Sequence, residues 1–374
     1  MRFLHTADLH IGKMLNDVSL LQDQQTVLSQ IVNIAAEKKV DGVLIAGDVY
    51  QRAAPTAEAM AVFDEFVRQL TEQGQKVFVI SGNHDSMLRI AYLSRLVRGA
   101  GLYVSEAFEG SLQQITLQDQ YGPLTIHLLP FIRPMQVKRF FPDRKIVSYQ
   151  DAVQAVLESA VIDRKQRNIL LCHQFITGSE TCDSEEKSIG GLDNIDASVF
   201  DAFDYVALGH IHKAQKCARE TLRYAGSPLK YSFSEMQHKK SVVIVDIEEK
   251  GEITLKTEPL YSPRDVRAVR GKMDQLMRMD YSEDLMWVTL TDEDVLPDAR
   301  QTLNTVFPHI LKFSIENSKT KLDMDVLAQE RMEDRSVTDL FCDFYRLQNN
   351  DRLPDEQQLQ LLEKVLKELE MEEK

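Results

Sequence analysis

The sequence lacks several features that would indicate other classes of protein. It has no run of about 18 apolar residues, which excludes a transmembrane helix. Its first residues, 1–8, are interrupted by charge too early to form a secretory signal. There is also no Gly-x-x-x-x-Gly-Lys-Ser/Thr stretch, so we do not expect this chain to bind ATP through a P-loop.

Cysteine is scarce, with only four in 374 residues. They are scattered along a long chain and show no metal-type pairing, which suits a protein in a reducing compartment. We therefore expect a cytoplasmic protein. The four are Cys172, Cys182, Cys217 and Cys342.

Positive charge is outnumbered, and the formal net charge is -14. That average argues against nucleic-acid binding by bulk electrostatics. The charge is unevenly placed, however. Residues 321–374 contain 15 acidic and 8 basic residues, a net of -7, whereas residues 133–145 and 213–240 are locally basic. Local basic surface is therefore available to a polyanion.

Apolar strands alternate with amphipathic helices in the first part of the chain. Short strands are expected at 2–4, 42–45 and 77–80, with helices at 22–38 and around 60–70. This β-α-β-α-β order predicts a sheet covered by helices, with ligand loops at the carboxyl ends of its strands. Further along we expect helices at 90–98 and 150–160, strands at 125–129, 168–171 and 205–208, and a meander with a hairpin at 249–251.

The length exceeds what one core usually organises, so we expect more than one domain. We place a first domain at 1–262, a small α+β unit at 263–325 and a helical segment at 326–374. In the small unit we expect a strand at 267–269, a helix from 273, a strand at 285–290, a helix at 295–306 and a strand at 310–315. In the last segment a helix opens at the capping box 336–339, and leucines recur at helical spacing over 359–369. These two helices either pack on each other or on the small unit, or they form a surface for a partner.

Five polar motifs follow predicted strands. Each brings carboxylate, amide or imidazole side chains to a strand end, where parallel strands deliver their ligand-binding loops. Taken singly, Asp48 could be a turn residue and His173 a core histidine; five complementary strand ends together point to a site. The residues are Asp8, His10, Asp48, Asn83, His84, His173, His210 and His212.

Mixed carboxylate, imidazole and amide ligands suit borderline-hard divalent ions such as manganese or iron. Seven or eight ligands are too many for one ion and suit two. Two ions bridged by a carboxylate can activate water and clamp a phosphoryl oxygen. Asp48, central in the order of the motifs, is the best bridging candidate.

The ordered motifs Asp8-x-His10, Gly47-Asp48, Gly82-Asn83-His84-Asp85, His173 and Gly209-His210-Ile211-His212 resemble those of the calcineurin-like metallophosphoesterases. Residues 205–213, 224–229 and 240–242 resemble the SbcD nucleases within that family. The resemblance implies an α/β fold: a β-sandwich flanked by helices, with a small α+β capping subdomain and a C-terminal helical segment.

The resemblance also implies roles for the motif residues. Asp8, His10, Asp48 and His212 would surround one ion, and Asp48, Asn83, His173 and His210 the other. His84 would be catalytic, acting on the scissile phosphate. Gln51 departs from the family, which often has Asp or His there; because Gln cannot act as an acid or base, a proton-transfer role at that position is absent or moved.

The implied activity is metal-dependent cleavage of DNA as a double-strand exonuclease and a single-strand or hairpin endonuclease in repair and recombination. The cofactors would be two divalent ions, with manganese favoured and magnesium or iron as alternatives. The partners would be DNA, an SbcC-type ATPase docked on the leucines at 359–369, and a second copy of the chain, with residues 87–98 as a candidate contact. A phosphatase or phosphodiesterase acting on a small molecule or a phosphoprotein is the alternative.

Overall fold

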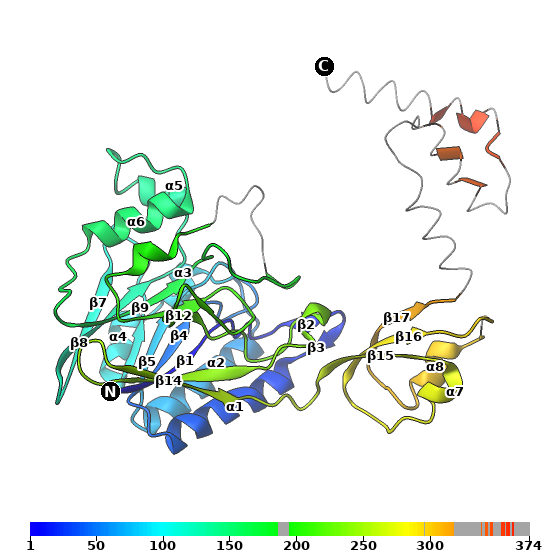
Figure 1. Cartoon of the computed structure of the whole chain (residues 1–374), viewed down its shortest axis with the longest axis horizontal. Coiled ribbons are helices and arrows are strands. Elements are labelled where there is room, and N and C mark those ends of the chain that lie inside the picture. Colours follow the sequence, from blue (N-terminus) through cyan, green and yellow to red (C-terminus); the bar gives the residue numbers. More distant parts are fainter. Residues whose placement is uncertain are drawn as a thin grey trace. The chain divides into compact units, whose positions relative to one another are not determined.

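The computed structural model describes residues 1–185, 194–294 and 296–317, together with isolated positions between 338 and 362. Two six-stranded sheets lie face to face and carry helices on their outer sides (Figure 1). Within the described residues, no helix is long and apolar enough to cross a membrane. The four cysteines are free thiols.

The first sheet contains the strands expected from the start of the sequence. Its order is β14-β13-β1-β4-β5-β6. Four strands run parallel: β1 (Arg2–Thr6), β4 (Gly42–Ala46), β5 (Lys76–Ile80) and β6 (Leu102–Val104). The hairpin of β13 (Ser241–Ile247) and β14 (Ile253–Pro259) completes it in antiparallel fashion, as the turn at 249–251 predicted.

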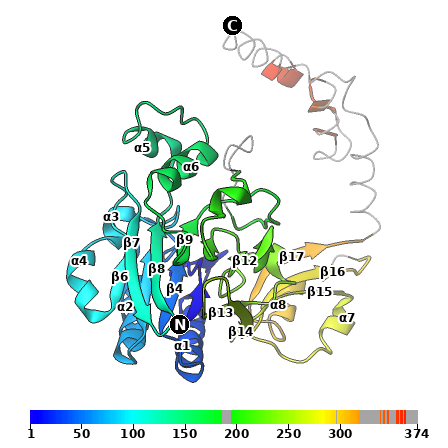
Figure 2. The same ribbon diagram turned by 60° about the vertical axis from the view of Figure 1, so that its left-hand side comes forward.

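Helices α1 (Leu21–Glu37) and α2 (Ala57–Glu72) lie side by side on the outer face of this sheet (Figure 2). Their apolar stripes, which include Val27, Ile31 and Phe66, share one buried cluster with Leu4 and Val43 of the strands. Helix α2 begins at Thr56, whose side chain accepts a hydrogen bond from the Ala59 N–H and so satisfies one of the unpaired donors of the first turn. The predicted helical periods are confirmed here.

The second sheet has the order β11-β12-β10-β9-β8-β7. Its strands β8 (Gly122–Leu129), β9 (Arg167–His173), β10 (Tyr205–Gly209) and β12 (Arg219–Tyr224) are parallel, between antiparallel edge strands β7 (Gln113–Asp119) and β11 (Gln215–Cys217). Helix α6 (Tyr149–Ser159) and a short 3₁₀ turn, η2 (Ala197–Phe200), cover its outer face.

An apolar core lies between the two sheets. Phe3, Leu44 and Phe78 of one sheet meet Ile169 and Tyr205 of the other, all fully buried. Burying such a side chain contributes roughly 1.5–3 kcal/mol. Because both faces of the central strands are covered, β4, β10 and residues 169–172 of β9 are continuous apolar runs rather than alternating ones. The core therefore holds the carboxyl ends of strands from both sheets close together.

The predicted helix at 90–98 is wrong in extent. Residues 90–98 were expected as one helix, but the chain forms α3 (Met87–Ile90), α4 (Ser94–Val97) and the turn η1 (Arg98–Ala100). Leu93 adopts a left-handed φ of 61°, which ends the helical path between them. The periodicity described the apolar residues correctly, but it could not register this break. Strands β6 and β7 and helix α5 (Pro134–Lys138) had not been predicted.

The small α+β unit has the expected element order. Strands β15 (Val266–Gly271), β16 (Leu285–Leu290) and β17 (Ile310–Ile315) form one sheet, with α7 (Met273–Leu276) and α8 (Ala299–Leu303) between them. Helix α8 is much shorter than the 295–306 predicted.

The chain divides into two compact units. One comprises Met1–Leu290 with Pro297–Ser314, and the other comprises Thr291–Leu296 with Ile315–Lys374. In the first unit, Arg264 pairs with the buried Asp23, and the Phe233 and Trp287 rings meet edge to face. The predicted boundaries at 262 and 325 stay predictions. The capping box at 336–339 and the leucines at 359–369 lie largely outside the described residues.

Candidate metal centre

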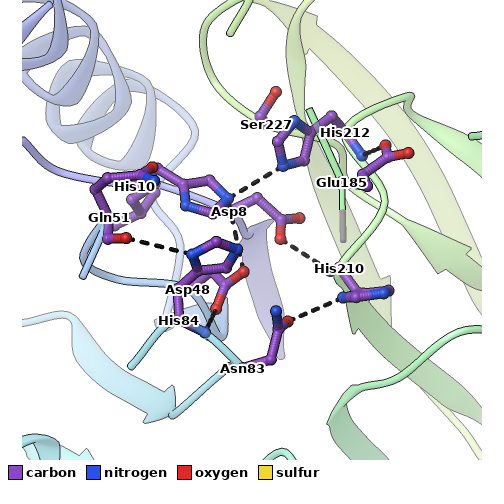
Figure 3. A network of polar contacts seen from close by, with 12 residues as sticks. Asp8, His10, Asp48, Gln51, Asn83, His84, Glu185, His210, His212 and Ser227 are labelled. Carbon is purple, nitrogen blue, oxygen red and sulfur yellow. Dashed lines mark hydrogen bonds and ion pairs between the residues drawn. The ribbon is translucent and has the colours of Figure 1, made fainter. Parts of the chain in front are cut away.

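Loops from both sheets converge on one cluster of polar side chains (Figure 3). Asp8 and His10 follow β1, Asp48 follows β4, and Asn83 and His84 follow β5. His173 ends β9, and His210 and His212 follow β10. All eight predicted residues therefore meet at the carboxyl ends of strands that are far apart in the sequence.

The backbone at this cluster is strained. Asp8, His10, Asp48 and His210 have φ values of 53°, 43°, 50° and 105°, a region that L-residues rarely adopt. Such positions cost of order 1–3 kcal/mol each and persist where the surrounding structure enforces them. Hydrogen bonds between loops supply that enforcement: the Asp8 N–H donates to the Gly47 carbonyl at 3.1 Å, and the His10 N–H to the Asp48 carbonyl at 2.9 Å.

Two glycines allow the loops to approach. A Cβ on Gly82 would overlap the carboxylate and amide nitrogen of Asp48, and a Cβ on Gly209 would overlap the Ala46 carbonyl oxygen. Every other residue carries a Cβ, so glycine is required at both positions for the loops to approach one another this closely.

One group of side chains surrounds His10. Its Nε2 lies 3.1 Å from Nε2 of His212 and 3.6 Å from an Asp48 oxygen. The Asp8 carboxylate closes this group: its Oδ1 accepts the His210 N–H at 2.9 Å. Asp8 Oδ2 is buried without a hydrogen-bond partner among the described residues. A buried carboxylate oxygen beside converging imidazole nitrogens fits a cation.

A second group surrounds His173. Its Nδ1 donates to the Ala46 carbonyl at 2.8 Å, so Nε2 is the nitrogen that faces the cluster. That Nε2 lies 3.3 Å from Asp48 Oδ2 and 3.0 Å from Asn83 Oδ1. Asn83 Oδ1 is also 3.0 Å from Nδ1 of His210. Asp48 thus contacts members of both groups, as a bridging carboxylate must.

The ionisable side chains of the cluster shift one another's pKa values. Burial would raise the pKa of Asp48, but the charge and hydrogen bond of His173 hold it well below its usual range. Burial raises the pKa of Asp8 to about 7. Burial lowers the pKa of His210 to about 3, with help from the nearby His173.

His173 and His212, by contrast, are strongly basic. Burial opposes their charged forms, yet Asp48 raises the pKa of His173 to about 9, and contacts with Cys182 and Glu235 raise that of His212 to about 10. Imidazoles held this tightly by carboxylates are good ligands once a cation displaces the proton.

Cation binding at neutral pH is expected to release protons. Because the pKa values of His173 and His212 are about 9 and 10, both rings are protonated at pH 7 and must lose that proton to bind a cation. Affinity should therefore increase as the pH rises from 6 toward these pKa values. Calorimetric titration with Mn²⁺ in two buffers of different protonation enthalpy checks this. Equal heats in both buffers would contradict it.

His84 differs from the other histidines. Its N–H donates to Asp48 Oδ1 at 2.9 Å, and its Nδ1 lies 3.2 Å from the Gln51 carbonyl (Figure 3). Donation from Nδ1 to this carbonyl leaves Nε2 on the opposite side of the ring, where it can face an arriving molecule. The ring is only partly buried and packs edge to face on His10. His84 is therefore placed to meet a molecule arriving at the cluster.

Sequence reasoning missed two supporting elements. The Asp85 carboxylate accepts the N–H groups of Gly82, Val49 and Tyr50, and so ties the β5 loop to the β4 loop. Its place in the Gly-Asn-His-Asp motif was the available signal.

The second element lies behind His212, where Cys182, Ser184 and Glu235 gather. The cysteine spacing gave no sign of this group, because the residues come from separate loops.

Comparison with known proteins gives matches over most of the chain. A family model described as "Calcineurin-like phosphoesterase" matches residues 1–214, and one described as "Type 5 capsule protein repressor C-terminal domain" matches residues 262–349. The SbcD subunit of the SbcCD nuclease from Staphylococcus epidermidis is 32% identical over 84% of this chain and 85% of its own.

The corresponding SbcCD nuclease subunit from Staphylococcus saprophyticus is 28% identical over 91% of this chain and 92% of its own. Among solved structures, a dimetal phosphatase from Danio rerio aligns with a TM-score of 0.43 and 12% identity, over 69% of this chain and 96% of its own.

Proposed function

Because the chain belongs to the calcineurin-like phosphoesterase family and, within it, to the SbcD nucleases, we propose that it cleaves DNA phosphodiester bonds at the cluster described above. It is a metal-dependent nuclease, and we assign it double-strand exonuclease and single-strand or hairpin endonuclease activity in cytoplasmic DNA repair and recombination. The observation that carries the assignment is the meeting of five strand-end motifs, with Asp48 in contact with both histidine groups.

The ligand assignment follows the two groups. One ion would be held by Asp8, His10, Asp48 and His212, and the other by Asp48, Asn83, His173 and His210. Side-chain ligand atoms of Asp8, His10 and His212, and of Asp8, Asp48 and His173, lie within 4.8 Å of one another. When bound, such a pair of ions supplies Lewis acidity to the phosphoryl oxygens and a lowered pKa to an attacking water. The mixed oxygen and nitrogen donors favour manganese, with magnesium or iron as alternatives.

The chain's own residues orient the reaction. Ala46 and Gln51 fix, through their carbonyl oxygens, which ring nitrogen of His173 and His84 faces the cluster. With its Nδ1–H donated to the Gln51 carbonyl and a second proton carried on Nε2, His84 would donate a hydrogen bond from Nε2 to a non-bridging phosphate oxygen or protonate the leaving oxygen. The Gln51 side chain cannot transfer a proton, so His84 is the acid best placed for this step.

Removing divalent ions tests the assignment. We expect chelated protein to lose cleavage of linear duplex and single-stranded DNA, and added Mn²⁺ to restore it more fully than Mg²⁺. A chromogenic phosphodiester and a phosphopeptide, assayed in parallel, distinguish a nuclease from a phosphatase. Cleavage of the phosphopeptide without cleavage of either DNA would contradict the proposed function.

DNA is proposed to approach over the basic residues near α5. Arg133, Lys138, Arg139 and Lys145 are exposed, and the Arg133 guanidinium lies 5.1 Å from the centre of the Phe131 ring, which itself packs against His173. The other basic stretch, 213–240, is mostly neutralised: Lys213, Lys216 and Lys230 pair with carboxylates, and Lys240 is buried. Counting basic residues along the sequence therefore overestimated the positive charge that residues 213–240 expose.

An SbcC-type ATPase is the proposed protein partner, in keeping with the names of the relatives. It would supply the ATP dependence that this chain, without a P-loop, does not provide. We retain the leucines at 359–369 as its proposed docking element.

A second copy of the chain is proposed to pack on α3 and α4. Leu88, Tyr92, Leu93 and Leu96 are 75%, 75%, 48% and 76% exposed, an apolar group that a lone chain would leave in water. Leu88→Glu with Leu96→Glu should convert a dimer to a monomer, as sedimentation equilibrium would measure. The matched control is Val161→Glu, since Val161 is 89% exposed and lies elsewhere. A wild-type monomer at micromolar concentration would contradict the proposal.

A further inference from the structure

Behind His212 lies a buried ion pair that the proposed mechanism does not use. Glu235, in the turn η3 (Phe233–Glu235), is fully buried, and Lys240 is 8% exposed. Lys240 Nζ donates to Glu235 Oε2 at 2.6 Å and to the Ser227 hydroxyl at 2.7 Å. Burying two charges is costly even when they pair, so apolar side chains would fill this space at least as well. The pair therefore calls for an explanation other than packing.

The glutamate faces the metal centre through its other oxygen. Glu235 Oε1 accepts the Ser184 hydroxyl at 2.5 Å and lies 3.3 Å from Nδ1 of His212. Ser184 Oγ is itself 2.8 Å from that Nδ1. The Nδ1–H of His212 thus meets an acceptor that is backed by a carboxylate, and Nε2 points toward His10.

The backbone of His212 is held by the same set of residues. Its N–H donates to Glu185 Oε1 at 2.7 Å, and its carbonyl accepts Lys240 Nζ at 3.0 Å. Figure 3 shows Glu185 and Ser227 beside His212. Together with Ser184 and Glu235, these contacts fix the position of the residue and the rotation of its ring.

We propose that Glu235, balanced by Lys240, is a positioning residue that acts through Ser184 to keep the proton of His212 on Nδ1 and its Nε2 lone pair on the metal centre. The inference rests on the proposed function, because it assigns His212 as a ligand. His173 obtains the same tautomer from the Ala46 carbonyl alone. A carboxylate hydrogen-bonded to a histidine also makes the imidazole a stronger electron-pair donor to a metal. The ion held by His212 should therefore be bound more tightly than the ion held by His173.

Metal binding, rather than nuclease activity, tests the proposal. Glu235→Gln and Ser184→Ala should each weaken binding of one Mn²⁺ by about 10- to 100-fold and leave the second ion in place. In ¹⁵N-histidine-labelled protein without metal, both variants should move the ring signals of His212 away from their wild-type positions, because the partner of Nδ1 has changed. Ser184 lies on a partly exposed loop, so Ser184→Ala decides the matter if Glu235→Gln fails to fold.

The matched control is Asp119→Asn. It removes a carboxylate from a comparable pair with the buried Arg167, but at the end of β7, and should leave both affinities unchanged. Wild-type affinity for both ions in Glu235→Gln and Ser184→Ala, or an equal loss in Asp119→Asn, would overturn the proposal. Failure of the wild-type protein to cleave DNA with both ions bound would instead count against the proposed function.

Discussion

Asp48→Asn should lose both metal ions and lower DNA cleavage by roughly 10³-fold or more, because loss of a single oxyanion-hole donor already costs about 10²–10³ in rate and here both ions would be lost. Asp48 would serve both ions, since its Oδ2 lies 3.6 Å from Nε2 of His10 and 3.3 Å from Nε2 of His173. An amide has nearly the same shape but no charge to balance two cations. Metal content after gel filtration and initial rates on linear duplex DNA measure the two effects.

Asp204→Asn is the matched control for this change. Asp204 is also a carboxylate with little exposed surface next to a strand of the sandwich, where its side chain is 9% exposed, accepts the Asn168 N–H at 2.7 Å and pairs with Lys250. It precedes β10 and so lies at the end opposite to the metal centre. It should lose some stability and keep two ions. Two bound ions in Asp48→Asn would refute the bridging role.

His84→Ala should lower DNA cleavage by about 10²- to 10⁴-fold, the usual contribution of a positioned acid or base, while two metal ions stay bound. The reason is its placement: its ring contacts His10 and the Gln51 carbonyl, and it is only partly buried. Its N–H to Asp48 is a backbone contact that alanine keeps. Metal analysis together with single-turnover cleavage separates chemistry from binding.

The comparison variant is Gln51→Ala. The contact with His84 uses the Gln51 backbone carbonyl, which this substitution preserves, so the loss should be far smaller than for His84→Ala. Loss of both ions in His84→Ala would make His84 a ligand, in line with its closeness to His10 and Asp48, and would remove the proposed acid.

The site could be predicted from the sequence where its residues directly follow a recognisable strand. Each motif directly follows an apolar strand, and parallel strands deliver such loops to one edge, so Asp8, Asp48 and Asn83 could be grouped by their place after successive strands. His173, His210 and His212 belong to the second sheet; they were grouped with the first three because they too follow predicted strands, and only the division of the ligands between two ions came from the family resemblance. The distances between them follow from how the two sheets pack on Phe3, Phe78 and Tyr205.

Other features had no local signal. The break at Leu93 depends on a left-handed backbone that apolar periodicity does not register. The Glu235–Lys240 pair looked like part of a basic stretch, whereas the fold removes Lys240 from the surface. Charge counted along a chain does not reveal which charges will be buried together.

The sequence alone determined the strands that precede the five motifs, the donor types at their ends and, through them, a two-metal phosphoesterase chemistry, because these depend on side-chain identity and short spacing. Only the tertiary structure decided which nitrogen of each histidine faces the centre. That choice is set by the Ala46 carbonyl for His173 and by Ser184 with Glu235 for His212, partners that lie 23 to 127 residues away and are brought close only by the folded sandwich.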